Sequence, residues 1–177
     1  MSKATIPEIH KAATMAVIVV TGGGAQAVAD LLAVPGASRT VLEALVPYSD
    51  TSLTEFLGAS PAQAVSIETA AALAQAAYRR ATTLREHDAV PVIGLACTAT
   101  LVTDRPKKGD HRAHIGLSTK EWTRVYSLTL RKGARDRQAE ERLVSDLLLR
   151  ICAEGCGVRP EGSLPLLPNE HVAIDER

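Results

Sequence analysis

Aromatic side chains are scarce in this chain of 177 residues, and its formal charges cancel. Aromatic residues make up 3% of the sequence, so it lacks the row of stacking rings on which single-stranded nucleic acids are held. The 20 lysine and arginine residues are matched by 20 aspartate and glutamate residues, which removes the positive field of a general nucleic-acid binder. We therefore expect no nucleic-acid partner.

Long hydrophobic runs are missing as well. The longest run, Met15–Val20, is far shorter than the ~20 residues that cross a bilayer. The opening segment MSKATIPEIHK contains no apolar stretch of the kind found in secretory signals. The expectation is a cytoplasmic protein with no membrane partner.

Cysteine is rare, because Cys97, Cys152 and Cys156 are the only three. Three cysteines make no disulfide framework. A spacing of four places Cys152 and Cys156 on one face of a helix, but no second ligand pair accompanies them, so packing is the favoured interpretation. We expect no metal and no other cofactor.

What is present is the composition of a folded α/β domain. Hydrophobic residues make up 46% and charged residues 23% of the chain, which is typical of globular proteins. We expect one domain over residues 1–155 and a Pro/Gly-rich extended tail over residues 156–177. Predicted strands alternate with predicted helices, which favours a three-layer α/β/α domain with a mixed sheet.

The predicted elements follow the periodicity of the apolar residues. Strands are expected at 15–20, 90–97, 113–117 and 121–131, and the apolar segment 40–48 fits either a short helix or a strand. Helices are expected at 25–32, 49–57, 66–87 and 135–154. The alanine-rich face of the helix at 66–87 is suited to close packing against a sheet.

The first candidate site is the turn Thr21–Gly24, which connects a buried strand to a helix. Backbone N–H groups at such a turn face an anion or a developing oxyanion. The turn matches neither the Walker A pattern nor G-x-G-x-x-G, since Ala27 stands where the third glycine would be. A purely structural role for Gly22, Gly23 and Gly24 stays open.

The second candidate site is the loop that follows the strand at 90–97. In an α/β sheet, the loops at the carboxyl ends of the strands gather at one edge, where ligands bind. The loop supplies hydroxyl groups and cations, and a solvated charged loop is the alternative interpretation. These side chains are Thr98, Thr100, Thr103, Arg105, Lys107, Lys108 and Arg112.

A metal site at His111 and His114 is not favoured. At a spacing of three in a strand, the two side chains point to opposite faces, and no cysteine or carboxylate cluster completes the set.

Four segments taken together resemble the CinA C-terminal domain family, whose active members are nicotinamide mononucleotide deamidases. In the first segment, the family turn E-S-C-T-G-G, followed by a helix and V-P-G-S-S, is similar to residues 20–25 and 34–38. In the second, the family's Y-S-N-x-x-K is similar to residues 48–53. The third segment is the family helix start A-V-S-x-E-x-A, which is similar to residues 64–70. The fourth is the strand end T-G-x-A-G-P with its Gly/Pro loop, which is similar to residues 97–99 and the loop after them, and then to residues 115–117. The resemblance spans about residues 15–153.

This resemblance implies a set of roles. The family's serine nucleophile falls on Thr21, its tyrosine on Tyr48 and its substrate-binding threonine on Thr98, with Ser49 beside them. The family's lysine base falls on Leu53, which accepts no proton, so the serine–lysine pair is absent. The substrate-binding residues implied in this way, or expected from the two loops, are Gly22, Gly23, Gly24, Ser49, Thr98, Thr100, Arg105, Lys107 and Arg112.

Three hypotheses follow. The first is an amidohydrolase acting on nicotinamide mononucleotide or a related nucleotide, with Thr21 as the nucleophile. The second is a module that binds a phosphorylated nucleotide without turning it over, and the third is a homodimer or higher homo-oligomer with a vestigial site. The stretch Arg105–Arg112 further resembles a plant-type branch in which such a domain precedes a nucleotidylyltransferase-like domain.

Overall fold

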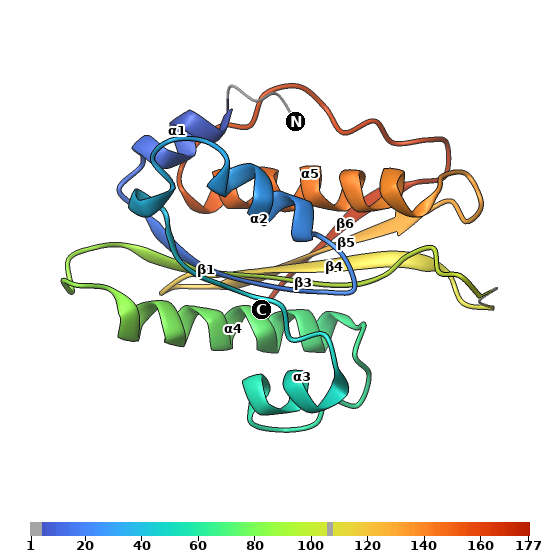
Figure 1. Cartoon of the computed structure of the whole chain (residues 1–177), viewed down its shortest axis with the longest axis horizontal. Coiled ribbons are helices and arrows are strands. Elements are labelled where there is room, and N and C mark those ends of the chain that lie inside the picture. Colours follow the sequence, from blue (N-terminus) through green and yellow to red (C-terminus); the bar gives the residue numbers. More distant parts are fainter. Residues whose placement is uncertain (1–4, 106–107) are drawn as a thin grey trace.

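The computed structural model describes residues 5–105 and 108–177, which form a six-stranded mixed sheet with helices on both faces (Figure 1). The sheet order is β2-β1-β3-β4-β5-β6. Strand β1 pairs in parallel with β2 and β3, and the other neighbours pair antiparallel. The strands are β1 (Met15–Thr21), β2 (Val41–Leu45), β3 (Val92–Thr100), β4 (His111–Ser118), β5 (Thr123–Leu130) and β6 (His171–Glu176).

The helices form the two outer layers, which confirms the predicted three-layer α/β/α architecture (Figure 1). One face carries α1 (Thr5–Lys11), α2 (Ala25–Leu32) and α5 (Arg137–Gly155), and the other carries α3 (Asp50–Leu57) and α4 (Ile67–Leu84). A short 3-10 helix, Ala37–Arg39, precedes β2. No helix in the described part of the chain is long and apolar enough to cross a bilayer.

Strand β1 is apolar from Met15 to Val20 because both of its faces are buried there. Ile18 and Val20 belong to the core under α2 and α5, whereas Val17 and Val19 belong to the core under α3 and α4. The carboxyl ends of β1 and β3 therefore meet at one edge of the sheet, between the two helical layers.

The alanine-rich helix α4 lies unusually close to the sheet, as its composition predicts. A Cβ at Gly94 would lie 2.1 Å from the Ala74 carbonyl oxygen, and one at Gly116 would lie 2.4 Å from the Ala70 carbonyl oxygen. Only glycine leaves room for the helix backbone at these two positions. The approach places the first turn of α4 directly beside the carboxyl edge of β3.

The C-terminal segment departs from the expected extended tail. Its last residues form β6, which pairs with β5 from Arg124↔Glu176 to Thr129↔His171 and becomes an edge of the sheet. The buried carboxylate of Glu170, at the entry to this strand, accepts hydrogen bonds from the backbone N–H groups of Leu167 (2.7 Å) and Arg131 (2.9 Å). The division of the chain at residue 155 remains a prediction, but residues 171–176 are part of the sheet.

Candidate functional site

A row of polar residues crosses four strands near the carboxyl edge of β1 and β3. Thr21 is paired in register with Thr98, Thr98 with His114, and His114 with Ser127. Side chains alternate along a strand, so Thr98 lies on the same face as Gly94, which contacts α4. The row therefore lies on the face covered by α3 and α4.

The two threonine hydroxyls differ in their partners. Thr98 is fully buried and donates a hydrogen bond of 2.6 Å to the Ala64 carbonyl oxygen, which anchors the segment before α4. Thr21 is half-buried, and its hydroxyl forms no hydrogen bond within residues 5–105 and 108–177. Among the described residues, the hydroxyl expected to be the nucleophile therefore has no base hydrogen-bonded to it.

His114 is the histidine of the row. Its Nδ1 lies 2.8 Å from the Ser127 hydroxyl oxygen. Burial lowers the pKa of His114, and the nearby Arg112 guanidinium lowers it further. The imidazole is therefore neutral at neutral pH, which is the form that accepts a proton.

Leu53, at the position of the family lysine, is a core residue. It is 3% exposed and packs in the cluster that contains Val17, Val19 and Leu73. The neighbouring candidates on this connection have different surroundings. Tyr48 is 69% exposed, and Ser49 caps α3 by accepting a hydrogen bond of 3.2 Å from the Ser52 N–H.

The Gly-rich turn is shaped by packing. Gly22 has φ +77°, and a Cβ there would lie 2.0 Å from the Ala99 carbonyl oxygen. Gly24 has φ +93° and is the N-cap of α2. A left-handed conformation beside a neighbouring strand favours glycine whether or not a ligand binds.

The anion expected at this turn is supplied by the protein itself. The carboxylate of Glu141, on α5, accepts hydrogen bonds from the Gly24 N–H (3.0 Å) and the Gln26 N–H (3.1 Å). These are the amide groups that an α-helix N-terminus offers to an anion. In this conformation Glu141 therefore occupies the α2 N-terminus, and a ligand anion at this turn remains a prediction.

The first turns of α5 clamp both loops of the candidate site. Arg137 donates to the carbonyl oxygens of Gly22 (2.9 Å) and Val102 (3.2 Å). Glu140, almost fully buried, accepts from the Val102 N–H (2.8 Å) and lies 2.7 Å from Nδ1 of His111. These contacts are not predicted from the sequence, because the charged residues of this helix resemble those of any solvent-facing helix surface.

The two histidines of β4 lie on opposite faces, as their spacing predicts, since His111 contacts α5 and His114 faces α4. The described residues contain no group of three His, Cys, Asp or Glu side chains that could hold a metal ion. Cys97, Cys152 and Cys156 are free and buried. Burial raises the pKa of the Cys97 thiol, so it is a poor nucleophile.

The cationic loop is exposed where the structure describes it. Arg105 and Lys108 lie at the surface, and Thr103 donates a hydrogen bond of 2.8 Å to the Arg105 carbonyl oxygen. Arg112 is half-buried, is paired in register with Thr100, and reaches the Val65 carbonyl oxygen at 3.4 Å. Lys107, also expected in the site, lies outside the described residues.

A cavity of about 580 Å³ adjoins this edge on the side of α2 and α5. Its lining includes Gly22, Gly23 and Tyr48 of the expected site, together with Arg137 and Glu141. Thr98 and His114 instead face α4. The expected residues thus gather at one edge but on two faces of the sheet, and their roles remain predictions.

No protein-family model matches the chain, and a search of curated proteins finds no significant match. Solved structures do match its fold. The competence/damage-inducible protein CihA from Agrobacterium tumefaciens superposes with a TM-score of 0.67 at 16% identity, over 86% of this chain and 94% of that one. A CinA-superfamily protein from Enterobacter cloacae superposes with a TM-score of 0.65 at 16% identity, over 86% of this chain and 89% of that one.

A competence or damage-inducible protein from Enterobacter asburiae gives a TM-score of 0.64 at 17% identity, over 86% of this chain and 95% of that one. At these identities the comparisons establish the fold. The CinA-like architecture expected from the four sequence segments is confirmed at that level. The relation to the plant-type branch stays a prediction.

Proposed function

We propose that this chain, which has the CinA-like fold, binds a phosphorylated nucleotide of the nicotinamide mononucleotide type and does not hydrolyse it. The site is the carboxyl edge of β1 and β3. The proposal is supported by the surroundings of two residues, Thr21 and Leu53. The Thr21 hydroxyl has no hydrogen-bonded base in the described part of the chain, and Leu53 is packed in the core.

A hydroxyl is a weak nucleophile until a base within about 2.6–3.2 Å takes its proton. Leu53 fills the position of the family lysine with apolar atoms. His114 is the nearest imidazole in the row, but its strand is separated from β1 by β3. With adjacent strands ~4.8 Å apart, the backbones of Thr21 and His114 lie about 10 Å from each other. Within residues 5–105 and 108–177, the base step of a serine–lysine type mechanism therefore has no group hydrogen-bonded to Thr21 to perform it.

The ligand's phosphate has to be held outside the α2 N-terminus, because Glu141 occupies that position. Arg105 and Lys108 are exposed in the loop that follows β3, and Arg112 lies in the strand beyond it. We assign these three cations to the phosphate. The scarcity of aromatic residues is consistent with a ligand held by its phosphate and carboxamide and not by ring stacking.

Isothermal titration of the full chain with nicotinamide mononucleotide tests the binding. We expect saturable binding whose affinity falls as the salt concentration is raised. The substitutions Arg105→Ala and Lys108→Ala should each lower the affinity by roughly three- to tenfold. Lys120→Ala, a surface lysine in the β4–β5 turn, is the matched control and should leave binding unchanged. Absence of binding, or equal binding by all three variants, contradicts the proposal.

One observation favours a second candidate, an amidohydrolase that uses Thr21. Its hydroxyl is half-buried and uncommitted, whereas that of Thr98 is already bonded. Hydrolysis would release ammonia from the carboxamide, and Thr21→Val, which keeps the shape but removes the hydroxyl, would abolish the release.

A further inference from the structure

Strand β6 is an edge of the sheet, and its outer side has no strand partner in the described part of the chain. At one end of the β5–β6 ladder, Thr123 and Arg177 exchange two backbone hydrogen bonds of 3.2 and 2.8 Å. Hydrogen-bonded and non-hydrogen-bonded pairs alternate along an antiparallel ladder. The backbone N–H and C=O groups of Val172, Ile174 and Glu176 therefore point away from β5, toward the open side, where a further strand can pair with them.

The side chains of β6 form a different pattern on each face of the sheet. The register with β5 places Val172 and Ile174 on the face of α2 and α5, and it places His171, Ala173 and Asp175 on the face of α4. Ile174 is 64% exposed although it is apolar, and Val172 is half-buried. One face of the strand is therefore apolar at its centre, whereas the other has a basic side chain near one end and an acidic side chain near the other.

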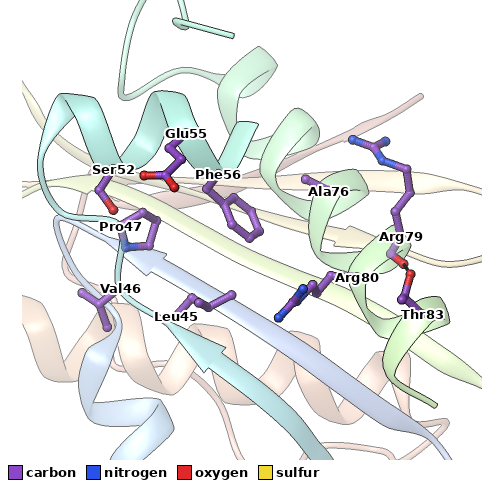
Figure 2. A pocket seen from close by; sticks show the side chains of 10 residues that line it. All are labelled: Leu45, Val46, Pro47, Ser52, Glu55, Phe56, Ala76, Arg79, Arg80 and Thr83. Atoms are coloured by element: carbon purple, nitrogen blue, oxygen red, sulfur yellow. Dashed lines mark hydrogen bonds between the residues drawn. The ribbon is translucent and has the colours of Figure 1, made fainter. Parts of the chain in front are cut away.

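The opposite edge strand, β2, has no such pattern. Figure 2 shows Leu45, at the end of β2, lining a pocket together with Phe56 of α3 and Arg80 of α4. The one charged residue of β2 is Glu43, and its carboxylate accepts hydrogen bonds of 2.7 and 2.9 Å from the Arg80 guanidinium. Strand β2 therefore offers an added strand no pair of opposite charges, and β6 is the edge better suited to recognition.

A two-fold axis that passes through Ala173, perpendicular to the sheet, makes β6 complementary to a second copy of itself. Residues directly opposite each other in an antiparallel pair share a face. About this axis, Val172 of one copy faces Ile174 of the other, and these are residues whose backbone groups point outward. His171 of one copy faces Asp175 of the other, so each interface contains two pairs of a basic and an acidic side chain.

We propose that the chain forms a homodimer in which two β6 strands pair antiparallel about this axis and join the two sheets into one. The backbone groups of Val172 and Ile174 supply the hydrogen bonds of the interface, and their side chains form its apolar contacts. The two pairs of His171 and Asp175 fix the register of the strands.

Other registers of the same two strands match their side chains less well. An axis through Ile174 would place His171 opposite Arg177 and the apolar side chain of Val172 opposite Glu176. An axis through Asp175 would place two carboxylates directly opposite each other, which destabilises an antiparallel pair. The axis through Ala173 is therefore the one that the sequence of β6 favours.

The carboxylates at the ends of the proposed interface already have partners within their own chain. Arg177 donates a hydrogen bond of 2.6 Å to Oδ1 of Asp175, and Arg124 donates one of 2.9 Å to Glu176. In the proposed register Glu176 lies opposite Glu170 of the other copy, whose buried carboxylate accepts hydrogen bonds from backbone N–H groups. Pairing of the two strands therefore leaves no isolated negative charge.

Light scattering of the full chain over a range of concentrations tests the association. We expect a mass that rises with concentration toward twice that of one chain. The substitution His171→Glu places a carboxylate opposite each Asp175 and should raise the dimer dissociation constant at least about tenfold. Adding Asp175→Lys to this variant restores opposite charges and should return the constant to within about threefold of the natural value. His87→Glu, at an exposed position elsewhere, is the matched control and should leave the constant unchanged.

Cysteine substitutions test the register. On the proposed axis the two copies of residue 173 form a non-hydrogen-bonded pair with Cα atoms about 4.5 Å apart, which a disulfide can bridge. Oxidation with diamide should therefore link the Ala173→Cys chains into a covalent dimer. Ile174→Cys lies off the axis, and Ala89→Cys, in an exposed turn, reports random collisions. Both controls should remain largely unlinked, and so should the natural chain, whose cysteines are buried.

Three results would each overturn the proposal. The first is the mass of one chain at every concentration. The second is the same dissociation constant for His171→Glu and for the natural chain. The third is a covalent dimer of Ile174→Cys in place of one of Ala173→Cys, which would move the axis to residue 174. The thermal unfolding midpoint of each variant shows that it is folded.

Discussion

Thr21 and Thr98 are partners in register at the carboxyl ends of two parallel strands, yet only Thr98 has its hydroxyl bonded within the protein. Its bond to the Ala64 carbonyl ties the sheet to the start of α4. The Thr21 hydroxyl remains half-buried and without a partner in the described chain. Of these two neighbouring residues, Thr98 therefore has a structural role, and Thr21 has a hydroxyl that can bind a ligand.

Leu53→Lys tests whether the family's lysine position faces the core or the site. A lysine here would place a charge among Val17, Val19 and Leu73, so we expect destabilisation of about 3 kcal/mol or more. Leu53→Met, which conserves volume, should cost less than about 1.5 kcal/mol. Urea unfolding measures both. A lysine variant as stable as the natural chain would show that the position opens into the site.

Gly94→Ala tests the contact between α4 and the sheet. The added methyl would meet the Ala74 carbonyl oxygen and the Tyr78 backbone, so we expect a loss of about 1–3 kcal/mol of unfolding free energy. Gly109→Ala, where a Cβ meets nothing within 4 Å, should stay within about 0.5 kcal/mol. Equal stability of the two variants would mean that the helix can shift away at no cost.

Glu141→Ala should expose the amide groups at the start of α2. Loss of its hydrogen bonds to Gly24 and Gln26 is expected to cost about 1–3 kcal/mol. Added sulfate should raise the thermal midpoint of this variant more than that of the natural chain, because an anion replaces the missing carboxylate. Gln138→Ala, in the same cavity, is the control. An equal effect of sulfate on all three proteins would contradict this interpretation.

The attachment of β6 should weaken in acid. Burial alone would raise the pKa of Glu170, but hydrogen bonds from Arg135 and from the Leu167 and Arg131 N–H groups outweigh it and hold the pKa below its ordinary value of 4.5. Because the folded-state pKa is the lower one, this contribution is present above about pH 4.5 and is lost as pH falls below it. The free energy of unfolding, measured between about pH 6 and pH 3, should fall less steeply for Glu170→Gln than for the natural chain. The same pH dependence for the variant and the natural chain would show that Glu170 makes no such contribution.

The periodicity of apolar residues predicted most of the sheet and its helices. The run Met15–Val20 became β1 because a strand buried on both faces is apolar without alternation. The alanine-rich segment became α4, packed on glycines of two strands. Strand β6 is not predicted, because half of its residues His171–Glu176 are polar and most of them are exposed. Its place depends on pairing with β5, which the segment's own composition does not reveal.

The candidate site was predicted less completely, for a related reason. The Gly-rich turn is visible in the sequence, but Glu141, which fills its anion position, lies more than one hundred residues further along the chain. A carboxylate on a helix surface gives no sign of such a contact. Thr21 and Thr98 are predicted from their places after two buried strands, and the resemblance to a known family adds their roles. The core position of Leu53 is visible only in the three-dimensional packing.

Whether the chain binds nicotinamide mononucleotide without hydrolysing it is tested most directly by two measurements on one preparation. These are the release of ammonia from this compound and its calorimetric binding. We predict binding with no ammonia above the rate in buffer, because no base in the described part of the chain is hydrogen-bonded to the Thr21 hydroxyl. Ammonia release that Thr21→Val abolishes, with binding retained, would contradict it and establish Thr21 as a nucleophile.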